Sequence, residues 1–149
     1  MVEQTPEALA KKLRVTPETR LLALNAPDAY AAQLEQVGAA VSRAPVDEGD
    51  TYDAVHIFVR DSADAQAAMT SALAALRPGG VFWVMWPKKT SGMATDLNRD
   101  SLAALALGQG WSPVSNVSID DTWSALRLRP EAEVKRTGNI GRLVEEAGQ

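Results

Sequence analysis

Hydrophobic and polar positions alternate along this chain in blocks that predict strands and helices in turn. Three short apolar runs, at residues 20–25, 52–59 and 81–86, are typical of strands that are covered on both faces. The segments at 28–37 and 62–76 carry apolar residues at helical spacing, which places those residues on one face of each helix. An α/β domain with a mostly parallel sheet is therefore expected.

Capping and turn residues mark where these elements begin and end. Proline cannot continue a helix and glycine lets the chain reverse, so Pro78-Gly79-Gly80 predicts a helix exit just before the strand at 81–86. Residues that can cap or open a helix predict where each helix begins. For the first three helices these residues are Thr5, Asp28, and either Asp61 or Ser62. A fourth helix, which includes Leu97, Leu102, Leu105 and Leu107, is expected to begin at Thr95 or Asp96.

The weaker segments suit the margins of the sheet. Residues 39–43 form a short, mildly apolar run that is more typical of an edge strand than of a central one. Residues 114–119 and 123–128 alternate in polarity on either side of Asp120-Asp121-Thr122, which predicts an antiparallel hairpin. The chain is thus expected to finish its sheet on an antiparallel pair.

One domain is expected at residues 1–129, followed by a polar tail at 130–149. A chain of 149 residues with 46% hydrophobic content can bury one sizeable core. The tail contains few large apolar residues, and its segment at 139–147 is either a terminal helix or disordered.

Charge and residue content exclude several classes of protein. A formal net charge of -4 argues against a general binder of nucleic acid or of an anionic membrane. With no cysteine and a single histidine, the chain has neither a disulfide framework nor a thiolate or histidine-rich metal site. The first residues lack the pattern of a signal peptide, and no apolar run approaches the length of a membrane span. A cytoplasmic location is expected.

Two motifs resemble those of the class I S-adenosylmethionine-dependent methyltransferases. They are Tyr52-Asp53-Ala54-Val55 and Leu76-Arg77-Pro78-Gly79-Gly80 followed directly by Val81-Phe82-Trp83-Val84, and the resemblance covers roughly residues 20–129. It implies a methyltransferase-like three-layer sandwich, with a doubly wound, mostly parallel sheet that ends in an antiparallel hairpin. The link before Tyr52 is too short for the helix, strand and helix of full-length methyltransferases, so about six strands are expected.

The resemblance breaks where those methyltransferases bind their cofactor. Their glycine-rich loop after the first strand is replaced by Leu24-Asn25-Ala26-Pro27-Asp28, which contains no glycine. The acidic residue that binds the ribose hydroxyls after their second strand is replaced by Arg43-Ala44-Pro45. No cofactor is therefore expected, and binding of S-adenosylmethionine, although possible, is predicted to be weak or absent.

A more specific resemblance is to a small bacterial family of unknown function whose signature is a WPKK-x-SG loop. The matching residues are Leu24-Asn25-Ala26-Pro27, Trp86-Pro87-Lys88-Lys89-Thr90-Ser91-Gly92 and Asp121-Thr122-Trp123-Ser124. This resemblance spans nearly the whole domain. It implies the same truncated fold and supplies no activity.

The expected fold predicts where a ligand would bind. In an open doubly wound sheet, ligands bind beyond the carboxyl ends of the strands, and three loops and the hairpin turn of this chain reach that edge. Cations with flexible donors and an aromatic plane suit an anionic ligand with a flat group, such as a nucleotide or a phosphorylated metabolite. The candidate ligand-binding residues are Asn25, Arg60, Trp86, Lys88, Lys89, Ser91, Gly92, Asp121 and Trp123.

Each candidate also has a purely structural interpretation. Lys88 and Lys89 can form a solvated loop, and Trp86 and Trp123 can cover the core. Asn25 can hold a turn through its side chain. His56 lies among apolar neighbours in a strand, which favours a core histidine over a catalytic one.

No catalytic constellation is evident, and three hypotheses follow. The first is a non-catalytic binding or regulatory module whose WPKKTSG loop engages an anionic small molecule or the acidic surface of a protein partner. The alternative is an enzyme, either a divergent methyltransferase or one that acts on a phosphorylated metabolite, since fold alone does not decide function. The third is a structural protein that assembles through the segment 130–149.

Overall fold

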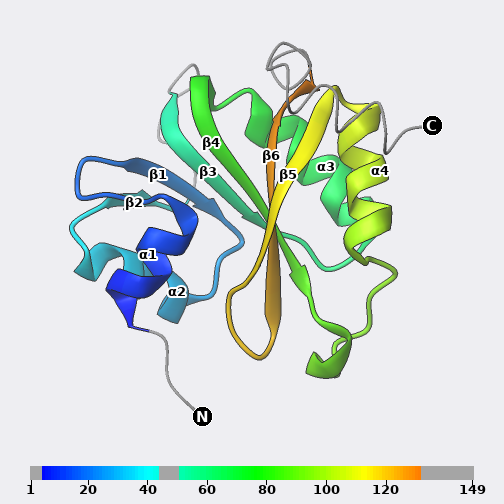
Figure 1. Ribbon diagram of the computed structural model, residues 1–149, viewed down its shortest axis with the longest axis horizontal. Helices are drawn as coiled ribbons and strands as arrows, with labels where there is room; N and C mark the ends of the chain where they lie inside the picture. The colour runs from blue at the N-terminus through cyan, green and yellow to red at the C-terminus, as the bar shows by residue number, and fades with distance from the viewer. Residues whose placement is uncertain (1–4, 44–50, 132–149) are drawn as a thin grey trace.

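The computed structural model describes residues 5–43 and 51–131, which form a six-stranded sheet with helices on both faces (Figure 1). The elements are, in chain order, α1 (Pro6–Leu13), β1 (Arg20–Leu24), α2 (Asp28–Gln36), β2 (Ala40–Ser42), β3 (Tyr52–Phe58), α3 (Ser62–Leu73), β4 (Leu76–Pro87), the 3-10 turn η1 (Lys89–Ser91), α4 (Arg99–Gly108), β5 (Trp111–Ser118) and β6 (Trp123–Pro130). The segment at 139–147 lies outside the described residues, and the boundary at residue 129 stays a prediction.

The strand order in the sheet is β2-β1-β3-β4-β6-β5. Neighbours among β2, β1, β3 and β4 pair in parallel, whereas β6 is antiparallel to both β4 and β5. The three-residue β2 lies at one edge, as its weak apolar character predicts. The expected α/β fold with about six strands and a closing hairpin is thereby confirmed.

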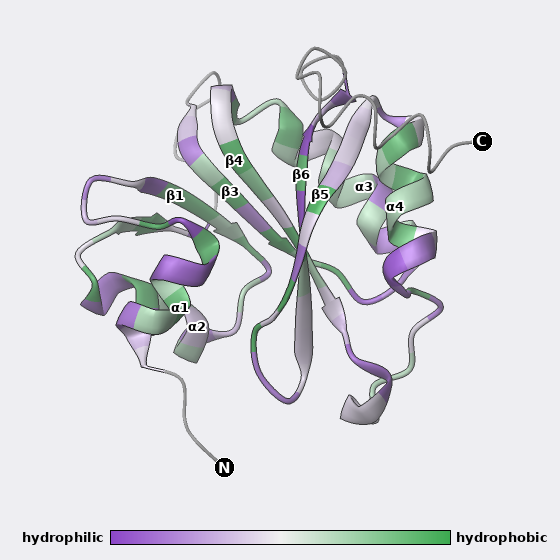
Figure 2. Cartoon of the chain, in the orientation of Figure 1, coloured by the Kyte–Doolittle hydropathy of each residue, from purple (hydrophilic) through white to green (hydrophobic). Residues whose placement is uncertain are grey.

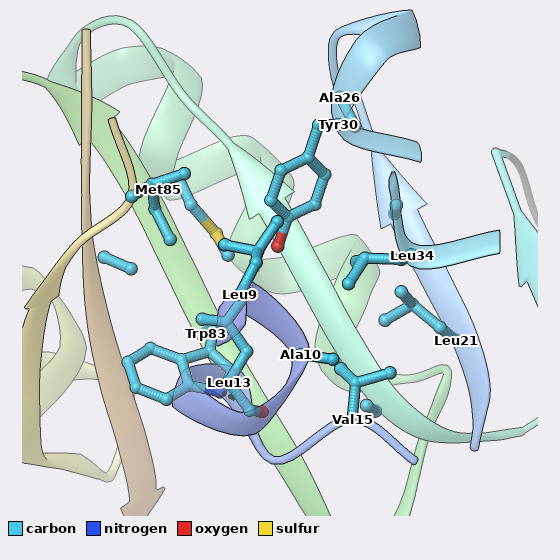
Figure 3. Packing of buried hydrophobic residues seen from close by; sticks show 14 of the residues in the cluster. Leu9, Ala10, Leu13, Val15, Leu21, Ala26, Tyr30, Leu34, Trp83 and Met85 are labelled. Atoms are coloured by element: carbon cyan, nitrogen blue, oxygen red, sulfur yellow. Dashed lines mark hydrogen bonds between the residues drawn. The ribbon is translucent and has the colours of Figure 1, made fainter. Parts of the chain in front are cut away.

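Each face of the sheet packs a separate hydrophobic core. Helices α1 and α2 cover one face, where Leu13 and Leu34 contact a cluster that includes Trp83 (Figure 3). Helices α3 and α4 cover the other face, around Met69 and Leu102. The central strands β3 and β4 are largely hydrophobic, as expected of strands buried on both faces (Figure 2).

Trp83 fastens α1 to the sheet. Its ring is 1% exposed, and its indole N–H donates a hydrogen bond of 3.0 Å to the carbonyl of Leu13. That carbonyl belongs to the last turn of α1, where backbone acceptors lack partners within the helix. The bond therefore satisfies a buried donor and a helix-end acceptor together.

The segment before Val81 differs from its prediction. Helix α3 ends at Leu73, and β4 already begins at Leu76. The register between β3 and β4 shifts from Tyr52↔Leu76 to Ala54↔Val81, so the intervening residues form an irregular bulge. Gly80 approaches its neighbours so closely that a Cβ there would lie 2.9 Å from the Asp53 carbonyl oxygen. The glycines thus serve a β-bulge instead of a helix exit.

The start of α4 also differs from its prediction. Asn98 and Ser101 form a capping box, with 2.9 Å hydrogen bonds in both directions, so the helix begins after Thr95 and Asp96. The Asp96 carboxylate instead accepts hydrogen bonds from the hydroxyl and the backbone N–H of Ser62, and these two bonds lower the pKa of Asp96. Leu107, in the last turn of this helix, is 46% exposed.

Two predicted caps are confirmed. Thr5 accepts a hydrogen bond of 3.1 Å from the N–H of Ala8 at the start of α1, and Asp61 accepts one of 2.8 Å from the N–H of Asp64 at the start of α3. None of the helices in the described residues is long and apolar enough to cross a membrane.

Candidate functional site

The carboxyl ends of β3 and β4 meet the β5–β6 turn at one edge of the sheet. The N–H of Lys88, just after β4, donates a hydrogen bond of 2.8 Å to the carbonyl of Thr122 in that turn. Pro87 pairs with Trp123, so the hairpin is in register with the end of β4. This is the edge at which a doubly wound sheet binds ligands.

The larger cavity at this edge has a volume of about 740 Å³ and lies between α1, α2 and the β5–β6 turn. Three aromatic side chains of its lining pack edge to face in a row. The ring centroids of Tyr30 and Phe58 lie 4.7 Å apart, and those of Phe58 and Trp123 lie 5.0 Å apart. Such a row gives the cavity a stiff apolar wall.

Two lysines of the cavity lining converge on Ser118. The ammonium group of Lys88 lies 2.5 Å from the Ser118 hydroxyl oxygen, and that of Lys12, from α1, donates a hydrogen bond of 3.0 Å to the Ser118 carbonyl. Neither lysine forms an ion pair with another residue of the described ranges 5–43 and 51–131. Two ammonium groups thus lie beside Ser118, and within the described part of the chain no carboxylate is bonded to either of them.

Two carboxylates lie in the same lining, on the β5–β6 turn. Asp120 accepts hydrogen bonds of 2.8 Å from the N–H groups of Thr122 and Trp123, which fixes the turn. Burial, and secondarily the charge of Asp120, raises the pKa of the Tyr30 hydroxyl well above its usual value. Asp121 is exposed at the tip of the turn. The cavity therefore presents both signs of charge, with the acids confined to the hairpin.

A smaller cavity of about 420 Å³ adjoins the first. It is lined by Asn25, Arg60 and Asp64, and Phe58 and Trp123 belong to the linings of both cavities. Asn25 adopts a left-handed backbone conformation with φ of 59° and turns the chain at the end of β1. The two cavities are thus neighbours that share part of their walls.

The structure brings only part of the predicted set together. Asn25, Arg60 and Trp123 line the smaller cavity, and Lys88, Asp121 and Trp123 line the larger one. The others lie elsewhere, because Trp86 is 6% exposed in the core against α3 and α4, and Lys89, Ser91 and Gly92 belong to neither lining.

Ser91 and Gly92 shape the loop after β4. The Ser91 hydroxyl donates to the Lys88 carbonyl at 2.6 Å and accepts from the N–H of Met93 at 3.2 Å. Gly92 has a φ of 81°, a left-handed conformation that suits glycine. These contacts fix the direction in which the chain leaves Lys88.

Several lining residues were not among the sequence candidates. Lys12 comes from the polar side of α1, and Tyr30 and Ser118 come from α2 and β5. A lysine on the exposed face of a short amphipathic helix gives no sequence signal, because its role depends on how α1 docks. The helical spacing of the segment 28–37 predicts only that Tyr30 lies on the apolar face of its helix, and in the structure Tyr30 also lines the cavity.

His56 is a core residue next to this site. It is fully buried, and its Nδ1 lies 2.7 Å from the Tyr30 hydroxyl oxygen. Burial lowers the pKa of His56 to about 3, so the imidazole is neutral near pH 7. No residue in the described part of the chain bonds to its Nε2.

The loop after β1 is tied to the end of β2 by Arg43. Its guanidinium donates to the Asp28 carboxylate at 3.0 Å and to the carbonyl of Ala26. In the resemblance described above, the position of Arg43 would hold a carboxylate that binds ribose. Pro27 offers no N–H, and the loop contains no glycine. These residues do not fit the way in which class I methyltransferases hold their cofactor.

Comparison with solved structures defines the class of fold. The chain is similar to a TehB-like methyltransferase from Corynebacterium glutamicum (TM-score 0.58, 9% identity, covering 86% of this chain and 89% of the other). It is also similar to a putative tRNA (m1A22) methyltransferase, Sp1610, from Streptococcus pneumoniae (TM-score 0.56, 13% identity, 87% and 71% covered). A third is the glycopeptide N-methyltransferase MtfA complexed with S-adenosyl-L-homocysteine (TM-score 0.55, 11% identity, 87% and 90% covered). The fold is therefore methyltransferase-like.

Within that class, the chain belongs to the family described as protein of unknown function (DUF3052), whose model matches residues 27–132. No curated protein matches the sequence.

Proposed function

We propose that the chain is a non-catalytic binding or regulatory module that holds a small anionic ligand between Lys12 and Lys88. The observation that carries this proposal is the convergence of both ammonium groups on Ser118 at the wall of the larger cavity. A volume of about 740 Å³ is in the range of small-molecule sites, which favours a metabolite over the acidic surface of a protein.

The ligand is expected to carry a flat group next to its anionic group. The aromatic row contributes an apolar wall beside the two cations, and a nucleotide or a phosphorylated metabolite has both kinds of group. Arg60, in the adjoining cavity, offers a further cation to a ligand that extends past Trp123.

S-adenosylmethionine is not the expected ligand. The guanidinium of Arg43 is bonded to the loop where the family's ribose-binding carboxylate would act, and Pro27 removes an amide donor from that loop. Micromolar affinity for S-adenosylmethionine in calorimetry would contradict this part of the proposal.

The alternative is an enzyme, and one pair of residues favours testing it. The Ser118 hydroxyl lies 2.5 Å from the side-chain nitrogen of Lys88, and serine–lysine pairs serve some hydrolases as nucleophile and base. Transfer of a labelled methyl group to a component of a cell extract, or hydrolysis of a phosphorylated metabolite that is lost in Ser118→Ala, would support catalysis.

A thermal-shift screen at fixed ionic strength tests the binding proposal. Nucleotides, sugar phosphates, S-adenosylmethionine and S-adenosylhomocysteine form the panel, and a ligand at a hundred times its Kd contributes about 2.7 kcal/mol. For a domain of this size the corresponding rise in Tm is about 5–10 °C.

Variants of neighbouring lysines provide the control for that screen. Lys12→Ala and Lys88→Ala should each reduce the ligand-induced rise in Tm, whereas Lys89→Ala should keep it, because Lys89 lies outside the cavity lining. Equal stabilisation of the parent and of a Lys12→Ala, Lys88→Ala double variant would remove these lysines from the site. Stabilisation only by acidic proteins, and not by small anions, would favour a protein partner.

A further inference from the structure

A second cationic cavity lies at the other end of the strands, opposite the carboxyl ends of β3 and β4. Its volume is about 290 Å³, and it is formed where β4 and β5 begin and β6 ends, away from the β5–β6 turn (Figure 1). Arg77, Arg127 and Arg129 contribute to its lining, together with the indole of Trp111. Three arginines thus border one small cavity in a chain with a net charge of -4.

Arg127 is the residue of this cavity that most requires a partner. It is partly buried, and its Nε is enclosed without a hydrogen-bond partner among residues 5–43 and 51–131. Burial, together with the charges of Arg14 and Arg129, lowers the pKa of Arg127. An enclosed donor that lacks an acceptor and faces like charges is unfavourable in the absence of an anion.

The carboxylate of Asp53, which pairs with Arg77 of the lining, is already engaged. Asp53 accepts a hydrogen bond of 2.9 Å from the N–H of Arg20 and forms an ion pair of 2.6 Å with the Nε of Arg77. These bonds, that of Arg20 first, lower the pKa of Asp53. The ion pair holds the side chain of Arg77 at the rim and leaves the charge of Arg127 uncompensated by Asp53.

We propose that this cavity binds one phosphate-type oxyanion, either inorganic phosphate or the phosphate group of a small monoester, with Arg127 as its main partner. Guanidinium groups bind phosphate oxygens through paired N–H donors, and several of them around one cavity match a tetrahedral anion. The volume suits a small anion or a compact monoester and is too small for a dinucleotide.

The bulge at the start of β4 favours this assignment. Gly79 has a φ of 79° and Gly80 has no room for a Cβ, so the segment that borders the cavity exposes bare backbone beside the arginines. The site is independent of the proposed function, because it shares no lining residue with either cavity of the other edge.

The four tryptophans of the chain allow each site to be observed separately. Full-length protein labelled with 5-fluorotryptophan is titrated with sodium phosphate at constant ionic strength and followed by ¹⁹F NMR, with resonances assigned by Trp111→Phe and Trp123→Phe. Phosphate should shift the Trp111 resonance in a saturable manner and leave that of the buried Trp86, which pairs with Ser124 at the other end of β4, in place. A Trp111 shift that does not saturate, or that sodium chloride reproduces, would overturn the proposal.

Arginine variants test which side chain binds the anion. Arg127→Gln should weaken phosphate binding about tenfold or more, as expected for the loss of a charge-assisted hydrogen bond. Arg129→Gln should weaken it as well, and it serves as a second variant should Arg127→Gln fail to fold. Arg99→Gln, which removes an equal charge from the exposed start of α4, should titrate like the parent. Identical titrations for all these variants would exclude the cavity.

Two further experiments distinguish free phosphate from a phosphate monoester, and the cavity of Arg127 from the cavity of Lys88. Glycerol 3-phosphate that binds more tightly than inorganic phosphate would assign the site to a monoester, and equal affinities would assign it to the free ion. In the Lys12→Ala, Lys88→Ala variant the Trp111 response should persist. A response of Trp123 alone, lost in that variant, would place phosphate at the other edge and contradict the inference.

Discussion

The hydroxyl oxygen of Tyr30 lies 2.7 Å from the Nδ1 of His56, and both side chains are buried between α2 and the sheet. The pair joins the helix that borders the candidate site to the central strand β3. Tyr30 is 5% exposed and His56 is fully buried, so the hydrogen bond between them is shielded from solvent. Its loss therefore affects a polar contact that water cannot replace.

Tyr30→Phe should destabilise the fold by about 1–3 kcal/mol, because it leaves Nδ1 of the buried His56 without a partner. Urea unfolding measures the difference. The double variant Tyr30→Phe, His56→Leu should recover part of the loss, since both polar partners are then removed together. A double variant less stable than Tyr30→Phe alone would contradict this explanation.

Stability should fall as the pH drops below about 6.5, because burial lowers the pKa of His56 to about 3 in the folded state. Between these values the unfolded chain binds a proton that the folded chain does not. The free energy of unfolding should decrease by up to about 1.4 kcal/mol per pH unit, most clearly between pH 6.5 and 5, above the range of most carboxylates.

His56→Leu provides the control for the pH experiment. The chain contains a single histidine, so in protein without a histidine tag this variant should lose the slope between pH 6.5 and 5. Parallel pH profiles of unfolding for the variant and the parent would show that His56 is not responsible.

Trp83→Phe should destabilise the fold by about 1–3 kcal/mol, because it removes the indole N–H that bonds to the Leu13 carbonyl and leaves part of the core unfilled. Amide hydrogen exchange in α1 should accelerate more than exchange in α3, which packs on the other face. Uniform acceleration in both helices would show that Trp83 has no particular role in fastening α1.

Gly80→Ala should destabilise the fold by about 1–3 kcal/mol, because a Cβ would lie 2.6 Å from Cδ1 of Leu76 and 2.9 Å from the Asp53 carbonyl oxygen. Gly108→Ala at the end of α4 is the matched control, since nothing lies within 4 Å of a Cβ there. Thermal unfolding should show a lower Tm for Gly80→Ala and an unchanged or slightly higher Tm for Gly108→Ala. A Gly80→Ala protein as stable as the parent would show that the bulge relaxes freely.

The strands could be predicted from the sequence wherever a short, continuous apolar run marks them. The runs that became β1, β3 and the end of β4 are apolar on both faces, and only a buried strand explains so short an apolar run. The start of β4 could not be predicted, because Pro78-Gly79-Gly80 suits a helix exit and a β-bulge equally. The bulge involves contacts with β3 that the local sequence does not encode, such as the ion pair of Arg77 with Asp53, 24 residues away.

The candidate site was predictable only in its location. The rule for open sheets placed Asn25, Arg60 and Lys88 at one edge, and each lies in a cavity there. The contribution of Lys12 depends on the docking of α1, which Trp83 fixes through a contact 70 residues away. Lys88 and Lys89 are adjacent in sequence, so the sequence gives no reason to distinguish them. Lys88 lines the cavity, whereas Lys89 begins the turn η1 and does not.

Strand β4 runs from the cavity lined by Arg77 and Arg127 to the cavity lined by Lys88, and from Phe82 to Met85 it pairs with β3 on one side and with β6 on the other. Such a strand is among the last parts of a domain to open. This paired part of β4 acts as a rigid spacer between the two proposed anion sites, which leaves no hinge through which they could approach one another. We therefore expect any coupling between ligands at these two proposed sites to involve rearranged side chains, because the strand between them keeps its length.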